Sequence, residues 1–187
     1  MKREITPTQL RRQKISGIVL VILGLTLIIF GVQFISEAED SSNWPSVEGT
    51  VQSVSVKRKL DTQNSNRTTR YFYTVNYRYE ADGKQRTASR FSLGDGNRAG
   101  KMYRELDEAQ KAANLAYPRG SKITVYYNPS DPDSTVIQPG KNWGTYVPLI
   151  IGLLFAGSGA FLFRLAKTIE QKQADQTSAS KLPSIFS

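Results

Sequence analysis

The sequence predicts an α+β membrane protein in which two transmembrane helices flank a small, mostly antiparallel β-domain that carries one helix. Two uncharged stretches, 15–35 and 143–163, predict the membrane helices, because a rise of about 1.5 Å per residue carries each across a hydrocarbon core roughly 30 Å thick. Alternating β-branched and aromatic residues between them predict strands. The remaining divisions are a tail at 1–14, a loop at 36–142 with its β-rich domain at about 47–140, and a second tail at 164–187.

Charge sets the predicted orientation. The net charge is +9, and the tails hold +6 of it, since 1–14 carries five basic residues and one acidic and 164–187 carries four and two. Positive charge beside a span favours the cytoplasmic side. We therefore expect a multi-pass protein of the cytoplasmic (inner) membrane, with both termini cytoplasmic and the loop 36–142 outside. The lipid bilayer is then its first partner, and a basic excess beside membrane spans argues against nucleic acid as another.

The first apolar stretch has a second interpretation, a cleaved signal sequence. Ser36-Glu37-Ala38 loosely resembles a small-x-small cleavage site. A signal core is usually about 7–15 residues long, and this stretch is longer, which favours an uncleaved helix.

Small residues recur along both apolar stretches, every seven residues in the first and every four in the second. The candidate helix-packing residues are Gly17, Gly24, Gly31, Gly152, Ala156 and Ala160. Such stripes allow helices to approach closely, within one chain or in a homo-oligomer. The ordinary frequency of glycine in membrane helices explains them equally well.

Tyrosines mark the clearest local pattern, a hairpin at 71–91. Alternate residues of its first half share one strand face, and they are Tyr71, Tyr73, Val75, Tyr77 and Tyr79. Asp82-Gly83 favours a two-residue type I′ turn. That turn pairs Ala81 with Lys84, Tyr79 with Arg86, Tyr77 with Ala88 and Val75 with Arg90. The tyrosine face could be a ligand platform, but five aligned apolar-bodied side chains need burial, so we expect core.

Weaker patterns complete the predicted domain. Val47–Val56 alternates as a strand, with a bulge between Val51 and Val54 where the alternation slips by one residue. The other expected elements are a linker at 36–46, a loop at 57–69, a helix at 101–116 with Met102, Leu106, Ala109, Ala113 and Ala116 on one face, and strands at 122–127 and 134–138.

The residue types exclude most catalytic chemistry. The chain has no cysteine and no histidine, which removes disulfides, the usual zinc, iron and copper ligands and the commonest general base. The glycines of 94–100 do not match a dinucleotide fingerprint, and Asn128, Asp131 and Asp133 lack the glycine and glutamate of a calcium loop. No catalytic, metal or cofactor-binding residue is predicted, and no cofactor.

The predicted loop 57–69, with Arg70 after it, is a candidate partner-binding segment. Its basic residues are Lys57, Arg58, Lys59, Arg67 and Arg70, against the single acid Asp61. Positive charge concentrated on a polar segment attracts acidic surfaces such as anionic lipid headgroups or an acidic protein. A solvated loop without a partner is an equally good interpretation.

Several short strings together are more specific than composition. They are Val47-Glu48-Gly49-Thr50-Val51, Tyr77-x-Tyr79-x-x-Asp82-Gly83, the run from Tyr117 to Pro129, and Pro139-Gly140. With these strings the chain resembles the DUF3592 family over about residues 47–140. The resemblance implies a small, membrane-anchored extracytoplasmic β-rich domain of unknown function, with no catalytic residues to assign.

Two hypotheses for function remain. The first is a non-enzymatic membrane protein that presents its extracytoplasmic domain for protein binding or assembly of a membrane complex, including an immunity or inhibitor role against a toxin. The alternative is an enzyme at the membrane surface, which would have only Asp, Glu, Lys, Ser and Tyr for its chemistry, with no pair at a diagnostic spacing. Two spans without an internal charge also argue against a transporter or channel.

Overall fold

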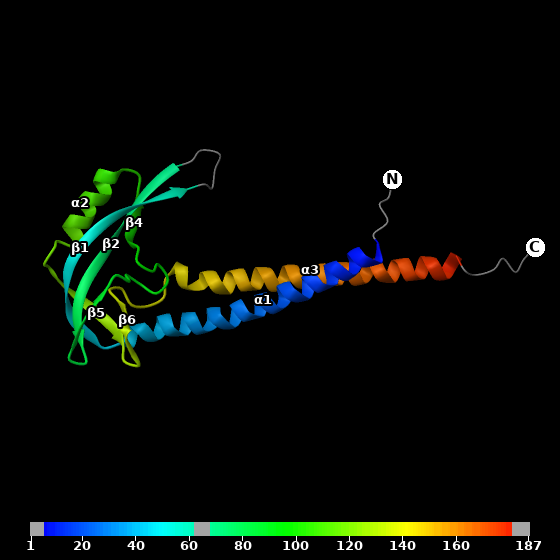
Figure 1. The fold of residues 1–187 in the computed structure, drawn as a ribbon, viewed down its shortest axis with the longest axis horizontal. Coiled ribbons are helices and arrows are strands. Elements are labelled where there is room, and N and C mark those ends of the chain that lie inside the picture. The colour runs from blue at the N-terminus through cyan, green and yellow to red at the C-terminus, as the bar shows by residue number, and fades with distance from the viewer. Residues whose placement is uncertain (1–5, 62–67, 181–187) are drawn as a thin grey trace, which may run out of the picture. The chain divides into compact units, whose positions relative to one another are not determined.

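The computed structural model describes residues 6–61 and 68–180 of the chain, which divides into two compact units (Figure 1). The helical unit comprises Met1–Val32 and Val147–Ser187, and the β unit comprises Gln33–Tyr146. Helix α1, Pro7–Asp40, belongs to both, so its last turns are part of the β unit.

The helical unit contains most of α1 and the whole of α3, Val147–Ser180, running antiparallel. Both helices are long and apolar enough to cross a membrane. Both extend beyond the uncharged stretches 15–35 and 143–163, because the neighbouring polar residues are mostly good helix formers. Helix α3 starts four residues later than the predicted span, since Trp143–Tyr146 forms the 3₁₀ helix η2.

Glycine brings the two helices into close contact. A Cβ added to Gly17 would lie 2.9 Å from a backbone oxygen of α3, and one added to Gly31 would lie 2.6 Å from a backbone nitrogen. Gly24, between them, would place a Cβ 2.7 Å from the Gly152 carbonyl oxygen. Any larger residue at these positions would therefore push the backbones apart.

On α3 the contact uses Gly152, Ala156 and Gly159, which lie against Gly24 and Gly17. Ala160, which the spacing of four groups with Gly152 and Ala156, is exposed. A helix completes a turn every 3.6 residues, so a second step of four, from Ala156 to Ala160, leaves the contact face. A step of three, from Ala156 to Gly159, stays on it. Since the three glycines of α1 are used within the chain, a second copy would have to contact another face of the pair.

Within the described residues the β unit contains one six-stranded sheet of order β3-β2-β1-β5-β6, with β4 also paired to β2. The strands are β1 Ser46–Asp61, β2 Thr68–Ala81, β3 Lys84–Ala88, β4 Ala99–Tyr103, β5 Lys122–Asn128 and β6 Asp131–Val136. All strand pairs are antiparallel. Helix α2, Leu106–Ala116, lies beside β1 and β2 (Figure 1).

The predicted hairpin and bulge are confirmed. Asp82 and Gly83 have φ values of 54° and 69°, as a type I′ turn requires. The ladder pairs Ala81 with Lys84, Tyr79 with Arg86 and Tyr77 with Ala88, and it ends there, before the expected pair of Val75 with Arg90. The register between β1 and β2 shifts between Val51 and Ser53, which places the bulge where the alternation slips.

The expected loop at 57–69 is wrong at both ends. Strand β1 continues to Asp61 and β2 begins at Thr68, so that Lys57 pairs with Phe72 and Lys59 with Arg70. Polar residues are compatible with strands here because one face of this sheet is solvated and the ladder satisfies the backbone. Residues 62–67, Arg67 among them, lie outside the described part of the chain.

The expected helix at 101–116 is also too long. Its first residues belong to β4, where Tyr103 pairs with Tyr71 and Ala99 pairs with Tyr73. This pairing buries Ala99 completely. The helical spacing of apolar residues at 101–116 gives no sign of it, because the partner strand lies about thirty residues earlier in the chain. Strand β6 likewise begins at Asp131 instead of residue 134.

The linker expected at 36–46 is largely helical. Helix α1 runs to Asp40, and the 3₁₀ helix η1 follows at Ser41–Asn43. Ala38 and Ser41 are completely buried in the β unit, so packing holds this segment in a helical conformation.

The two faces of the sheet differ, and we call them the core face and the open face. The predicted tyrosine core is confirmed for four of its five residues: Tyr73, Val75, Tyr77 and Tyr79 are at most 5 % exposed and pack with Ala113 of α2 on the core face. Tyr71, at the end of this row, is half-buried. The alternate residues of β1 and β2 lie on the open face, which α2 leaves uncovered.

A second, smaller cluster covers one end of the open face. Ala38 and Trp44 pack with Leu93 and Val136, and Phe34 and Tyr126 border them. Tyr126 belongs to the open face because it alternates with Val125, which is in the core. The last turns of α1 are therefore held against the open-face side of the β unit.

The type I′ turn gives a first prediction. Gly83→Val should destabilise the β unit by roughly 1–2 kcal/mol, because a β-branched residue is strained at positive φ. Nothing lies within 4 Å of the added Cβ, so strain would be the whole cause. Unfolding of the full chain in mild detergent, followed by the near-ultraviolet circular dichroism of its tyrosines, measures the change. The control Lys84→Val adds the same side chain to the next, exposed strand residue, and equal loss in both variants would contradict this account.

The helix contact gives a second prediction. Gly24→Leu should separate α1 from α3 and lower the free energy of unfolding by about 1–3 kcal/mol, the usual cost of overpacking. Gly157→Leu is the matched control, since nothing lies within 4 Å of a Cβ at Gly157. Thermal unfolding in the same detergent compares them, and a Gly24→Leu protein as stable as the control would mean that the close contact is not needed.

Candidate functional site

The open face carries most of the basic residues of β1, β2 and β5. Alternation along β1 places Ser55, Lys57 and Lys59 on this face, opposite to the core residues Val54 and Val56. Arg70 and Arg78 of β2 and Lys122 of β5 share it, as their partners Lys59 and Thr50 in the ladder show.

A hollow of about 510 Å³ lies on the open face, between β1, β2 and the loop before β4. Its residues on the strands are Lys57, Lys59, Phe72 and Thr74, and those from the loop side are Gly94, Asp95, Asn97, Arg98 and Met102. We call it the basic hollow, because three of these residues are cationic and one, Asp95, is acidic. Thr74 is buried, and its hydroxyl donates a 3.4 Å hydrogen bond to the Ser55 carbonyl.

The three cations of the basic hollow differ in whether an acidic residue pairs with them. Arg98 forms an ion pair with Asp95, which neutralises the single acid. Among the residues that the structure describes, Lys57 and Lys59 form no ion pair, and both side chains are exposed. The hollow therefore keeps two uncompensated ammonium groups beside a guanidinium, an arrangement that attracts anions.

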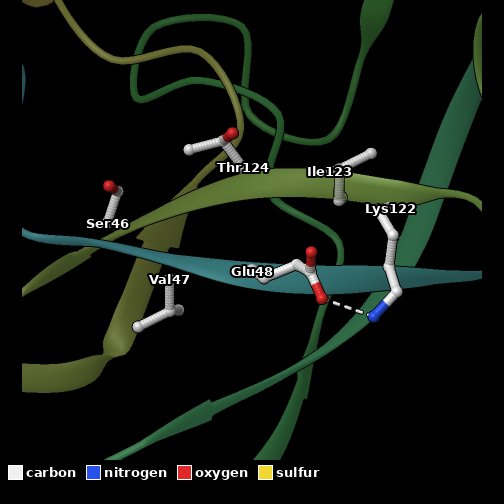
Figure 2. A pocket seen from close by; sticks show the side chains of 6 residues that line it. All are labelled: Ser46, Val47, Glu48, Lys122, Ile123 and Thr124. Atoms are coloured by element: carbon white, nitrogen blue, oxygen red, sulfur yellow. Dashed lines mark hydrogen bonds and ion pairs between the residues drawn. The ribbon is translucent and has the colours of Figure 1, made fainter.

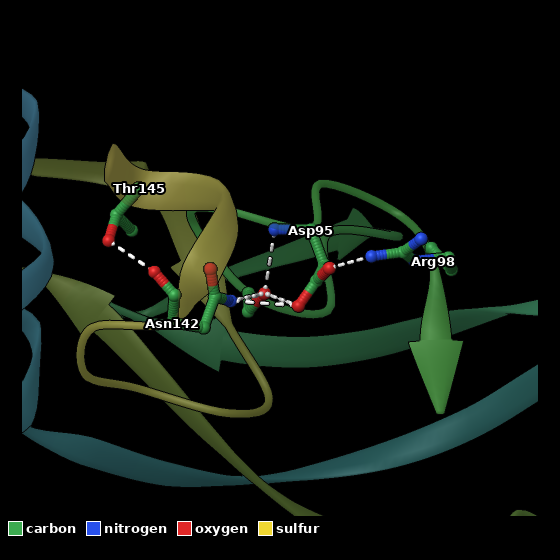
Figure 3. Close-up of polar contacts among 5 residues, drawn as sticks. Asp95, Arg98, Asn142 and Thr145 are labelled. Atoms are coloured by element: carbon green, nitrogen blue, oxygen red, sulfur yellow. Dashed lines mark hydrogen bonds and ion pairs between the residues drawn. The ribbon is translucent and has the colours of Figure 1, made fainter. Parts of the chain in front are cut away.

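A polar network holds the loop side of the hollow in place (Figure 3). The Asn142 side-chain nitrogen donates hydrogen bonds of 2.8 Å to both the Ser92 hydroxyl and the Asp95 carboxylate. The Asp95 amide in turn donates to the Ser92 hydroxyl at 3.0 Å. The Thr145 hydroxyl donates to the Asn142 carbonyl at 2.6 Å, which continues the network into η2.

Gly94 lets the loop approach η2 closely. A Cβ at Gly94 would lie 2.6 Å from the backbone nitrogen of Thr145, so no other residue fits without a shift. Together with the Asn142 network, this contact fixes Asp95 and hence Arg98. The cation contributed by the loop is thus preorganised, whereas Lys57 and Lys59 are placed by the strand itself.

Two other hollows on the β unit are less charged. One of about 310 Å³ lies where β1 meets β5, and there the ammonium of Lys122 reaches the Glu48 carboxylate, so the charges cancel (Figure 2). The other, around Ser53 and Asn76, has no charged residue in its lining. The basic hollow is therefore the best candidate site on the described β unit.

The structure divides the residues that sequence reasoning grouped as one segment. Lys57 and Lys59 line the basic hollow, and Arg70 lies on the same face beside Lys59. Arg58 pairs with Tyr71 and so points to the opposite face, and Arg67 lies outside the described residues. The helix-packing residues lie between α1 and α3, apart from Ala160, and take no part in this site.

Sequence reasoning missed Phe72, Thr74, Arg98 and Asn142. Phe72 and Thr74 alternate with the tyrosines of β2, and this alternation alone could have assigned them to the open face. Arg98 and Asn142 have no such signal, since the hollow depends on a contact between loop 92–98 and a segment more than forty residues later.

The side chains around the basic hollow offer groups that can hold an anion. Ser92 and Asp95 are neighbours, but the chain has no histidine to transfer a proton between a hydroxyl and a carboxylate. In the described part of the chain, no three Asp or Glu residues come close enough to hold a metal ion. Ammonium, guanidinium, hydroxyl and amide groups around an open hollow are suited to an anionic group such as a phosphate or a carboxylate.

Comparison with known proteins agrees with the resemblance seen in the sequence. The profile of a domain of unknown function, DUF3592, matches residues 47–142, which is the part of the β unit from the second residue of β1 to the residue before η2. A search of curated proteins found no match.

Proposed function

The chain belongs to the DUF3592 family, and from that starting point we propose that it is a non-enzymatic, membrane-anchored protein whose β unit binds an anionic partner on its open face. The basic hollow is the observation that carries this proposal. It combines uncompensated cations, a buried hydroxyl and a loop fixed by hydrogen bonds, as a binding site requires, and the carboxylate in its lining, Asp95, is already bonded to Arg98 and Asn142.

The exposed apolar surface of the helices supports anchoring in a membrane. Only 11 % of the most apolar window of each helix is buried, so neither resembles the core helix of a soluble protein. Side chains such as Ile22, Ile29, Leu154 and Phe161 are each more than half exposed. Exposure of this apolar surface to water would be unfavourable, whereas in a bilayer the same surface would contact acyl chains.

The tail charges support an orientation with both termini in the cytoplasm and the β unit outside, in a multi-pass protein of the cytoplasmic membrane. The β unit itself argues against cleavage after Ala38. Phe34 and Ala38 pack in its second cluster, and removing them would expose Trp44, Leu93 and Val136.

Two kinds of partner fit this function, an acidic protein or an anionic lipid surface. Assembly of a membrane complex and immunity against a toxin are both consistent with the first kind. An enzyme at the membrane surface is the alternative function, and it would need a proton-transfer pair among Asp, Glu, Lys, Ser and Tyr.

Single cysteines test the orientation, because the chain has none of its own. Ser130→Cys, in the exposed turn between β5 and β6, should react with an impermeant thiol reagent on intact cells, with any outer membrane made permeable. Gln176→Cys, exposed near the end of α3, should react only after lysis. Labelling of Gln176→Cys but not of Ser130→Cys on intact cells would overturn the orientation.

Cysteines also test occupancy of the open face. Ser55→Cys lies beside the basic hollow, and Asn114→Cys lies on α2, on the core-face side. A partner bound to the open face should slow the labelling of Ser55→Cys severalfold in native membranes compared with detergent, with no such slowing for Asn114→Cys. The protection should disappear when Lys57, Lys59 and Arg98 are replaced by Gln. Equal rates in membranes and detergent for both cysteines would contradict binding at this face.

A further inference from the structure

The chain enters and leaves the β unit at adjacent points. Lys141 forms a 2.8 Å ion pair with Glu39, and the hydrogen bond that it donates there raises the pKa of Lys141. The Gly140 amide donates a 2.8 Å hydrogen bond to the buried hydroxyl of Ser41. We call these four residues the anchored corner. Glu39 and Ser41 come just after the apolar part of α1, and Gly140 and Lys141 come just before η2 and α3.

The anchored corner adjoins the basic hollow. Asn142, the next residue after Lys141, donates a hydrogen bond to Asp95, which lines the hollow. Before the corner, Ala38 packs with Leu93, just before Gly94 of the hollow. Both connections to the apolar helices therefore dock against the loop that forms one side of the hollow.

Trp143 gives an independent indication of what surrounds this corner. It is 77 % exposed although it is one of the largest apolar side chains, and it stands next to Asn142 at the start of η2. Exposed tryptophan beside a membrane span is typical of the headgroup region, where its ring contacts lipid and its N–H stays hydrated.

The basic hollow has the chemistry for a lipid phosphate. Lys57 and Lys59 project from one strand face, and Arg98 approaches from the loop, so three cations surround a space whose volume is in the roughly 300–1,000 Å³ range of ligand sites. Phe72 and Met102 add apolar surface for the uncharged part of a headgroup. A phosphodiester carries one negative charge shared by its two non-bridging oxygens, and several donors are needed to satisfy the hydrogen-bonding capacity of these oxygens.

We propose that the basic hollow binds the phosphate groups of anionic phospholipids in the leaflet next to the β unit, so that the open face rests on the membrane. This inference rests on the proposed membrane anchoring. The anchored corner joins the apolar helices and is followed by Asn142, which bonds to Asp95 of this hollow, and the exposed Trp143 comes next in the chain. An acidic protein is the other occupant, and the experiment separates the two.

The test uses the full chain with a bimane fluorophore on Ser55→Cys, reconstituted in nanodiscs whose lipids carry a nitroxide quencher on the headgroup. In discs with about one third phosphatidylglycerol, the fluorophore should be strongly quenched, and in discs of phosphatidylcholine alone much less. Replacing Lys57, Lys59 and Arg98 with Gln should lower the quenching in anionic discs to the neutral level. The loss of three cations near an anionic surface corresponds to roughly a hundredfold weaker contact.

Matched variants control for charge and for folding. Lys84→Gln, Lys111→Gln and Arg119→Gln together remove the same charge from exposed positions outside the basic hollow, and this triple variant should keep the quenching. A triple variant with Lys57→Arg, Lys59→Arg and Arg98→Lys keeps the charge of the basic hollow, so it should also keep the quenching. Bimane on Asn114→Cys should remain unquenched in both kinds of disc.

Four outcomes would overturn the proposal. Equal quenching in anionic and neutral discs, or equal loss in both Gln triples, would exclude a specific contact with anionic headgroups. If inorganic phosphate added to neutral discs changed the bimane emission as much as anionic lipid does, the hollow would be assigned to a free anion. Protection of Ser55→Cys in native membranes without quenching in anionic discs would assign it to an acidic protein, and would leave the proposed binding function standing.

Discussion

The β unit depends most on the complete burial of Tyr77. Burial raises the pKa of this tyrosine to about 12, and its hydroxyl must find partners inside the protein. It donates a 2.8 Å hydrogen bond to the Arg90 carbonyl and lies 3.0 Å from the Thr135 hydroxyl. One residue of β2 therefore fixes both the segment after β3 and the strand β6, which is far away in the sequence.

The burial of Tyr77 also decides the character of the opposite face. Side chains alternate along β2, so a core of Tyr73, Val75, Tyr77 and Tyr79 leaves Phe72, Thr74 and Arg78 on the open face. Strand β1 is paired to β2 in register after its bulge, and this pairing brings Lys57 and Lys59 to the same face. Without the bulge at Gln52, these lysines would be directed toward the core, where an unpaired ammonium is very costly. The basic hollow is thus a consequence of how the core is built.

Local patterns in the sequence predict the parts of the fold that local physics determines. The apolar helices follow from the length of two uncharged stretches, the bulge and the tyrosine core from a period of two residues, and the turn from the dipeptide Asp82-Gly83. Strand β4 could not be predicted in this way, because Ala99–Tyr103 is a strand only through its pairing with β2. The candidate site is predictable only in part. Charge identifies Lys57 and Lys59, but the polar pattern around them predicts a loop instead of a strand, and Arg98 takes its place only through the contact of Asp95 with Asn142.

Attachment at two adjacent points changes what a binding site on this domain has to achieve. A free domain would need enough affinity to offset the loss of its translational and rotational freedom. In the membrane-anchored protein that we propose, a domain held at both ends through one corner would already have lost most of that freedom, and the effective concentration of nearby headgroups would be high. A few cations are then sufficient to fix its orientation, even though the same contacts would bind weakly in solution. The shallow shape of the basic hollow, which would be unsuitable for capturing a dilute ligand, is appropriate for a third point of contact beside the two covalent connections.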